Sequence, residues 1–109
     1  KYPNCVGSVG QDWDNWLALG AVDYVVPMNY TESPAALEEL LRQQARTPGR
    51  ARRTIVGLGV TANESRLDAR QVIDQIRLVR RYGMAGESLF DLDTVLEKSI
   101  LPYLRLGIW

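Results

Sequence analysis

Apolar residues follow two different spacings along this chain. Where they recur every three or four positions they predict helices, and where they form short unbroken runs they predict strands buried on both faces. The expected helices cover residues 12–19, 33–47, 68–83 and a last segment from about residue 93 to a break at Pro102, and the expected strands cover residues 22–28, 54–60 and 84–90. Helices and strands therefore alternate, with strand starts about 31 residues apart.

Cap residues stand at the expected ends of these helices. Asp12 suits an N-cap, and Ser33 followed by Pro34 suits the start of the second helix. Asp68 and Gln71 have the spacing of a capping box. The first helix also carries Trp13 and Trp16, which we interpret as packing residues rather than as a platform for sugar.

Regular alternation of strand and helix predicts an α/β fold with a parallel sheet built from βα units. We expect about three strands with flanking helices, arranged as a partial TIM (β/α)₈ barrel. A full barrel needs roughly 250 residues, and this chain has 109. Residues 1–109 are therefore expected to form a single domain that is part of a larger barrel, with strand edges left exposed.

Charge and residue usage exclude several classes of function. Thirteen Lys and Arg balance thirteen Asp and Glu, so we expect no nucleic-acid partner. The chain has no histidine, which removes histidine-based catalysis and most zinc sites, so no metal is expected. Its one cysteine, Cys5, permits no disulfide within the chain. We also expect no membrane span.

Two short motifs favour ordinary structural roles. Gly57-Leu58-Gly59 lacks the third glycine of a dinucleotide-binding loop, and no other motif indicates a cofactor. The stretch from Arg42 to Arg53 is basic, and its run Arg50-Ala51-Arg52-Arg53 is typical of a solvated loop.

Candidate chemistry lies where the expected strands end, because parallel sheets bind ligands at the carboxyl ends of their strands. Asn29 and Tyr30 follow the first strand, Asn63 the second and Asp91 the third. An amide and a phenol there can bind sugar hydroxyls, and the ring can stack on a sugar. The alternative for Asn29 is turn chemistry. The alternative for Asp91 is helix capping, which Asp93 can perform instead.

Asp91 and Glu87 are the carboxylates considered for catalysis. Glu87 lies inside the third expected strand and either points inward as a perturbed acid or outward as an ordinary surface charge. Glycoside hydrolysis usually needs two carboxylates held on either side of the scissile bond. The spacing of these residues does not identify such a pair.

The segment Gln11-Asp12-Trp13-Asp14-Asn15-Trp16-Leu17, followed by Gly20 through Pro27-Met28-Asn29-Tyr30-Thr31, resembles the late barrel of bacterial glycosyl-hydrolase-like 10 proteins. Val56-Gly57-Leu58-Gly59 and the segment from Gly86 to Asp91 are also similar. Glu87-Ser88 departs from the pattern, which has apolar or small residues there.

This resemblance implies the C-terminal portion of a TIM-like barrel that acts on carbohydrate, in some members the glycan of bacterial cell wall. It implies a secreted, periplasmic or lipid-anchored parent protein and a sugar cleft lined by Asn29, Tyr30 and Asp91. The principal acids of such barrels often lie on earlier strands, so we expect this chain alone to be inactive. Two alternatives remain open: a small non-catalytic flavodoxin-like module that binds a ligand or partner, and a fragment that self-associates through its exposed sheet edges.

Overall fold

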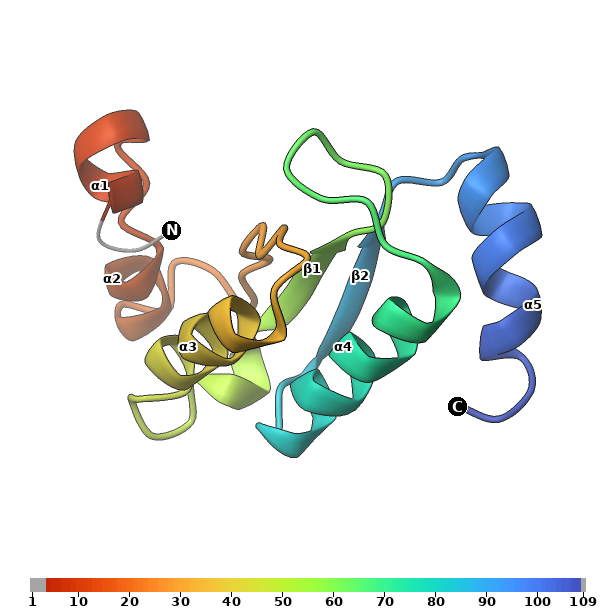
Figure 1. Ribbon diagram of the computed structural model, residues 1–109. Coiled ribbons are helices and arrows are strands. Elements are labelled where there is room, and N and C mark those ends of the chain that lie inside the picture. Colours follow the sequence, from red (N-terminus) through yellow and green to blue (C-terminus); the bar gives the residue numbers. More distant parts are fainter. Residues whose placement is uncertain (1–3, 109) are drawn as a thin grey trace.

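The computed structural model describes residues 4–108 and places helices beside a small parallel sheet (Figure 1). In chain order the elements are α1 (Asn4–Val9), α2 (Trp13–Ala18), α3 (Pro34–Gln44), the 3₁₀ turn η1 (Ala51–Arg53), β1 (Ile55–Gly59), α4 (Ala69–Arg81), β2 (Gly86–Phe90), the π-helical turn η2 (Leu96–Ile100) and α5 (Leu101–Leu104). The expected α/β class is confirmed, as are helices at the four expected places; α1 was not expected.

The sheet has two strands, which contradicts the expected partial TIM barrel of about three strands. β1 and β2 run parallel, with Ile55 opposite Gly86 and Gly59 opposite Phe90. The first expected strand, residues 22–28, lies along β1 but forms only two isolated bridges, Val25 to Thr54 and Met28 to Gly57.

Pro27 explains why residues 22–28 do not form a regular strand. The Val25 N–H donates to the carbonyl of Arg53, so the next donor in a parallel ladder would be the N–H of residue 27. Proline has no N–H, and that hydrogen bond cannot form. The Pro27 carbonyl still accepts from the Gly57 N–H at 3.0 Å. The segment therefore touches the sheet without extending it.

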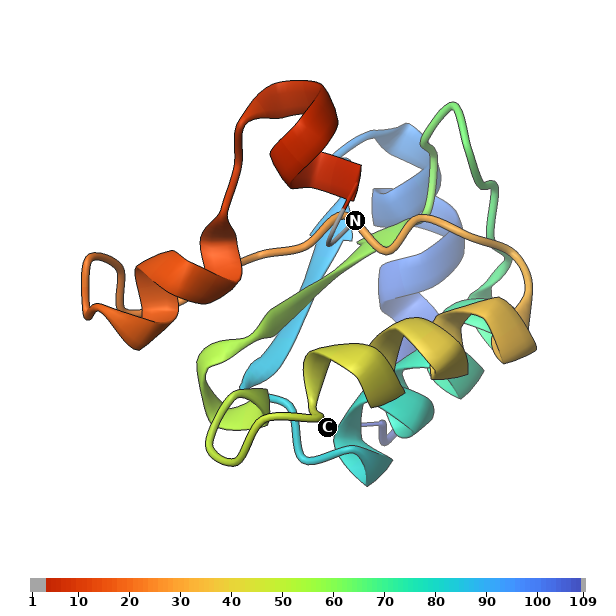
Figure 2. The ribbon, with the colours of Figure 1, turned by 90° about the vertical axis from the view of Figure 1, so that its left-hand side faces the viewer.

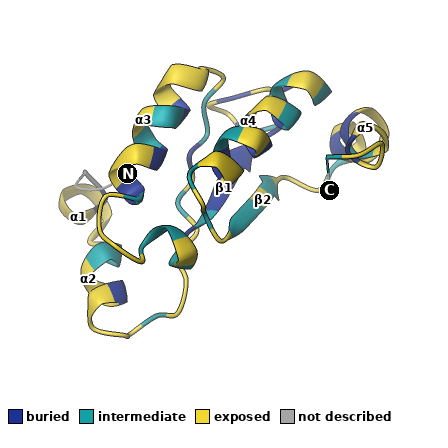
Figure 3. Ribbon diagram, turned by 90° about the horizontal axis from the view of Figure 1, so that it is seen from below, coloured by how far each residue is buried: buried dark blue, intermediate teal, exposed yellow. Residues whose placement is uncertain are grey.

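The core lies on one face of the sheet, where the helices pack. Val56 and Leu58 of β1 are fully buried, and they form one cluster with apolar residues of α3, α4, η2 and α5: Leu37, Leu41, Val72, Ile76, Val79, Leu96, Ile100 and Leu104. Figure 2 shows α3 and α4 side by side, and Figure 3 shows their buried residues on the sides that face the strands. Burial of each such side chain stabilises the fold by about 1.5–3 kcal/mol.

The opposite face of the sheet is lined by small and exposed residues. Side chains alternate along a strand, so Gly57 and Gly59 of β1 turn away from the core face occupied by Val56 and Leu58. The neighbouring segment leaves Tyr24, Val26 and Met28 more than half exposed. We call this surface, made by Tyr24, Val26, Met28 and Phe90, the open sheet face.

Two arginines of the basic stretch bind backbone and a carboxylate instead of lying in a solvated loop. The Arg53 guanidinium donates to the carbonyls of Leu17 and Asp23, each at 2.9 Å, and to that of Val22. Arg50 Nε lies 2.6 Å from Asp14 Oδ1, and its side chain is only 11% exposed. Together they fasten α2 and the segment after it to the start of β1.

The last helical segment begins with a cap and changes pitch before Pro102. The Leu96 N–H donates to Asp93 Oδ1 at 2.8 Å. The π-helical turn ends at Ile100, and Pro102 is the second residue of α5. Proline has no N–H to continue the hydrogen-bond ladder, which accounts for the change of pitch just before it. Among residues 4–108, no helix has the length and apolar character needed to cross a membrane.

Replacing Arg53 by glutamine should destabilise the protein, because three carbonyls lose a charged donor. We expect the free energy of unfolding to fall by about 2 kcal/mol, as measured by urea denaturation followed by circular dichroism. Arg52→Gln is the matched control, since Arg52 is exposed in the same turn, and it should change stability by less than about 0.5 kcal/mol. Equal losses in the two variants would contradict this role of Arg53.

Candidate functional site

The segments that follow residues 22–28, β1 and β2 meet at one end of the sheet. Tyr30, Thr61, Phe90 and Asp91 lie there, and we call this group the strand-end rim. The rim joins an aromatic pair, held by a ring contact, to a carboxylate and a hydroxyl, held by a hydrogen bond. It therefore brings together two of the predicted site residues, Tyr30 and Asp91.

Tyr30 and Phe90 form a stacked aromatic pair. Their ring centroids are 5.5 Å apart and their planes differ by 20°. Tyr30 is half-buried, whereas 46% of Phe90 is exposed. Such pairs are worth about 0.5–1.5 kcal/mol beyond the area they bury, so Tyr30 holds the exposed ring of Phe90 in place.

Asp91 carries the exposed carboxylate of the rim. Its Oδ1 accepts a hydrogen bond of 2.9 Å from the Thr61 hydroxyl, which holds one oxygen of this exposed side chain. Asp91 follows Phe90 directly, and the peptide bond between them is cis. An aromatic ring and a charged acceptor therefore stand side by side.

Asp93, not Asp91, performs the helix capping that was considered for Asp91. The Leu96 N–H donates to Asp93 Oδ1. This hydrogen bond holds the pKa of Asp93 below its ordinary value of 3.8, although burial acts in the opposite direction. The capping carboxylate is ionised at neutral pH, and Asp91 remains available to a ligand.

The loop that carries Asn63 and Glu64 lies near Tyr30. Thr61 and Arg66 pair across the loop in an antiparallel bridge, and the buried Ser65 hydroxyl donates to the Gly59 carbonyl at 2.6 Å. Asn63 and Glu64 are exposed at the tip. Burial, and then the nearby charge of Glu64, raise the pKa of Tyr30 above its ordinary value of 10.0. Tyr30 is therefore a neutral hydrogen-bonding group at physiological pH.

Asn29 is fully buried and serves the fold. Its Nδ2 donates to Gln44 Oε1 at 2.8 Å, and its Oδ1 accepts from Gln44 Nε2 at 2.9 Å. This reciprocal amide pair satisfies both side chains, as buried polar groups require. Asn29 therefore presents no side-chain group to the solvent, and it anchors the loop of Tyr30 to α3.

Glu87 lies on the other face of the sheet from the rim. Alternation along β2 places Glu87 with Leu89, which packs against the core cluster, and opposite to Phe90. The Glu87 side chain is 8% exposed, and its Oε1 lies 3.4 Å from Nη2 of Arg80 on α4. The structure therefore separates Glu87 from Asp91.

Sequence reasoning did not identify the partners that give the rim its shape. Phe90, the stacking partner of Tyr30, and Thr61, the donor to Asp91, were not among the predicted site residues. Phe90 directly precedes Asp91, and Thr61 follows β1. Because the ends of adjacent parallel strands lie next to each other, these positions could have predicted that both residues belong to the site.

Within residues 4–108, no three His, Cys, Asp or Glu side chains gather as a metal site. The chain matches no protein-family model, and searches of curated proteins and of solved structures find no match either. Function is therefore inferred from the geometry of the rim and from the resemblance in the sequence.

The phenol of Tyr30 should titrate above pH 10.0, as measured by the ¹³C shift of its ring Cζ. Because the folded pKa is raised, the stabilising effect of the protonated phenol is complete below the unfolded pKa and is lost as pH rises through the folded value. Glu64→Gln should lower the pKa of Tyr30 only in part, because burial is the larger cause. Tyr24, which is exposed, is the internal control, and an unchanged Tyr30 pKa in Glu64→Gln would contradict the contribution of Glu64.

Proposed function

We propose that this chain binds carbohydrate at the strand-end rim. The single observation that carries this assignment is the exposed Phe90 ring, stacked on Tyr30 and directly followed by the Asp91 carboxylate. A sugar ring presents an apolar face edged by hydroxyl groups. The aromatic pair can stack on that face while Asp91 and the neutral Tyr30 phenol accept and donate hydrogen bonds at its edge.

The proposed ligand is a polysaccharide glycan, of which bacterial cell-wall glycan is one candidate. The resemblance to glycosyl-hydrolase-like 10 proteins supports this class and also supports a parent protein that is a glycoside hydrolase outside the cytoplasm. The rim suits an uncharged sugar, because Asp91 and the ionised Asp93 lie beside it.

Cleavage of the glycan is assigned to the parent protein and not to this chain alone. Hydrolysis usually requires two carboxylates about 5–10 Å apart across the scissile bond. Asp91 lies on the rim, but Glu87 pairs with Arg80 on the opposite face. These two residues cannot act on one bond, and this separation favours the second candidate function, a binding module without catalysis.

Removing the Phe90 ring should weaken glycan binding. We expect Phe90→Ala to raise the Kd for N-acetylglucosamine oligomers or cell-wall oligosaccharides about 5-fold, since one stacking contact is worth roughly 1 kcal/mol. The measurement is an amide chemical-shift titration, in which the wild-type chain should show shifts at Tyr30, Thr61, Asn63 and Asp91.

Tyr103→Ala is the matched control for this titration, because Tyr103 is 55% exposed on α5, away from the rim. It should leave the Kd unchanged. A well-folded wild-type chain that shows no shifts with either oligosaccharide would overturn glycan binding by the rim. Equal weakening by the two variants would show that binding does not use Phe90.

We also propose that copies of the chain associate through their sheet edges. Within residues 4–108, no segment pairs with the outer edge of β2, so its backbone groups can accept another strand. Residues 22–28 flank the β1 side of the sheet and run parallel to β1, which they bridge at Val25 and Met28. The β2 edge of one copy can therefore pair with residues 22–28 of a second copy, and the contact would cover Val26 and Met28.

Self-association of this kind predicts a molar mass that rises with protein concentration, as measured by sedimentation equilibrium. Val26→Lys should keep the chain monomeric over the same range, because Val26 is 53% exposed in the monomer and a charge there would be buried in the contact. Leu19→Lys, at a residue 74% exposed on the α2 side of the chain, is the control. A constant monomer mass for the wild type would rule out the association.

A further inference from the structure

A second cavity lies away from the strand-end rim, between α2 and α3. Its volume is about 640 Å³, within the range of small-molecule sites. α3 follows the loop of Tyr30 and ends at Gln44, so the cavity beside its last turns lies toward the start of β1, whereas the rim lies at its end. The cavity therefore forms a site separate from the proposed glycan site.

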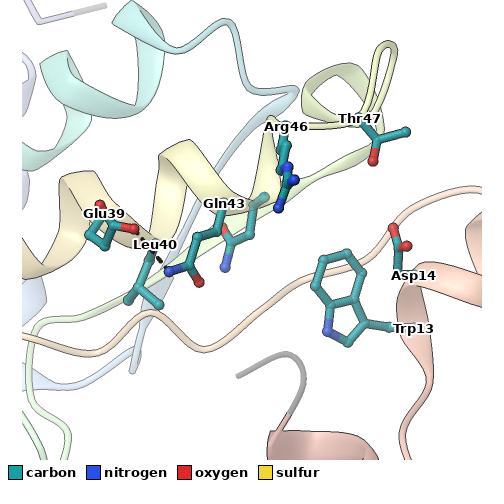
Figure 4. Close-up of a pocket in the computed structure, with 8 residues that line it drawn as sticks. Trp13, Asp14, Glu39, Leu40, Gln43, Arg46 and Thr47 are labelled. Carbon is teal, nitrogen blue, oxygen red and sulfur yellow. Dashed lines mark hydrogen bonds between the residues drawn. The ribbon is translucent and has the colours of Figure 1, made fainter.

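An aromatic ring and an aliphatic side chain face each other across this cavity. Trp13 lines it from α2, and Leu40 and Gln43 line it from α3. Figure 4 shows these side chains on either side of an open space, with Arg46 pointing into that space from the end of α3. A flat ring can lie between such walls and stack on the indole.

The wall that carries Trp13 is held in place by an ion pair. Arg50 Nε lies 2.6 Å from Asp14 Oδ1, and Arg50 Nη2 donates to the Asp14 carbonyl at 3.1 Å. The Arg50 side chain is 11% exposed, and a partly buried pair of this kind is screened less by salt than a surface pair. The cavity is therefore bounded on both sides by fixed elements.

Charge decides which kind of ring fits the cavity. Of its carboxylates, Asp14 is paired with Arg50, and Glu39 is paired with Arg42 and also accepts from Gln43. Arg46 is exposed and forms no ion pair with any residue of the described part of the chain. The uncompensated charge at the cavity is therefore the positive charge of Arg46. A guanidinium can bind a carboxylate through two parallel hydrogen bonds.

We propose that the cavity between α2 and α3 binds a small organic carboxylate that carries a planar ring. The ring lies between Trp13 and Leu40, and the carboxylate pairs with Arg46. This site is independent of the glycan assignment, because it shares no side chain with the rim and selects an anion.

1-Naphthoate is a suitable probe, and the measurement is an amide and indole chemical-shift titration of the whole chain. We expect shifts at the Trp13 indole N–H and along the last turns of α3, with a Kd on the order of 1 mM for a ligand of this size. The uncharged 1-naphthalenemethanol should bind at least about 10-fold more weakly, since it cannot pair with the guanidinium.

Arg46→Gln should weaken 1-naphthoate binding about 10-fold, and Arg46→Lys should weaken it less, because the charge remains but the two-point geometry is lost. Arg52→Gln is the matched control, since it removes a cation of the same basic stretch that does not line the cavity, and it should leave the Kd unchanged. All three arginine variants change exposed side chains, so they should stay folded.

Three results would overturn this site: no shifts at Trp13 or α3, shifts confined to Tyr30 and Phe90 of the strand-end rim, or equal weakening by Arg46→Gln and Arg52→Gln. The first would mean that the cavity takes no ring-bearing anion. The second would mean that the probe binds by apolar contact elsewhere. The third would mean that only the general positive charge of the stretch attracts it.

Discussion

The close approach of Tyr30 to β1 is the contact on which the strand-end rim depends. A Cβ atom at Gly59 would lie 2.8 Å from Tyr30 Cγ and 2.5 Å from Ser65 Oγ, closer than such atoms pack. Because Gly59 has no side chain, the ring of Tyr30 rests on the strand and stacks on Phe90, and the Ser65 hydroxyl reaches the Gly59 carbonyl. One residue without a side chain thus fixes both the aromatic pair and the loop beside it.

Local signals in the sequence predicted the helices well and the extent of the sheet poorly. The capping box of Asp68 and Gln71 is present as expected, because it depends on residues three positions apart. The partial barrel was wrong because a strand exists only through hydrogen bonds to a neighbour. Pro27 stands where the ladder with β1 requires an N–H, and the composition of residues 22–28 does not reveal that register.

The same holds for the site: roles that depend on neighbours in the sequence could be predicted, and roles that depend on distant residues could not. The position of Asp91 and the capping by Asp93 follow from the order of residues. The spacing of two between Glu87 and the core residue Leu89 places Glu87 on the helix-covered face of the sheet, where it pairs with Arg80 and is not an ordinary surface charge. The burial of Asn29 could not be predicted, because its partner Gln44 is fifteen residues away on α3. The structural role of Arg53 was hidden for the same reason: its acceptors are backbone carbonyls of another segment.

The hydrogen-bonded amide pair of Asn29 and Gln44 connects the two proposed sites. Asn29 directly precedes Tyr30 of the rim, and Gln44 lines the cavity of Trp13 and Arg46. A buried amide left without its partner costs about 1–3 kcal/mol, so the two side chains hold each other and keep the Tyr30 loop in register with the end of α3. The rim offers carboxylates and a neutral phenol, whereas the cavity offers a guanidinium. The same helix therefore positions two surfaces of different charge, and the anion that suits the cavity would be repelled by the carboxylate of the rim.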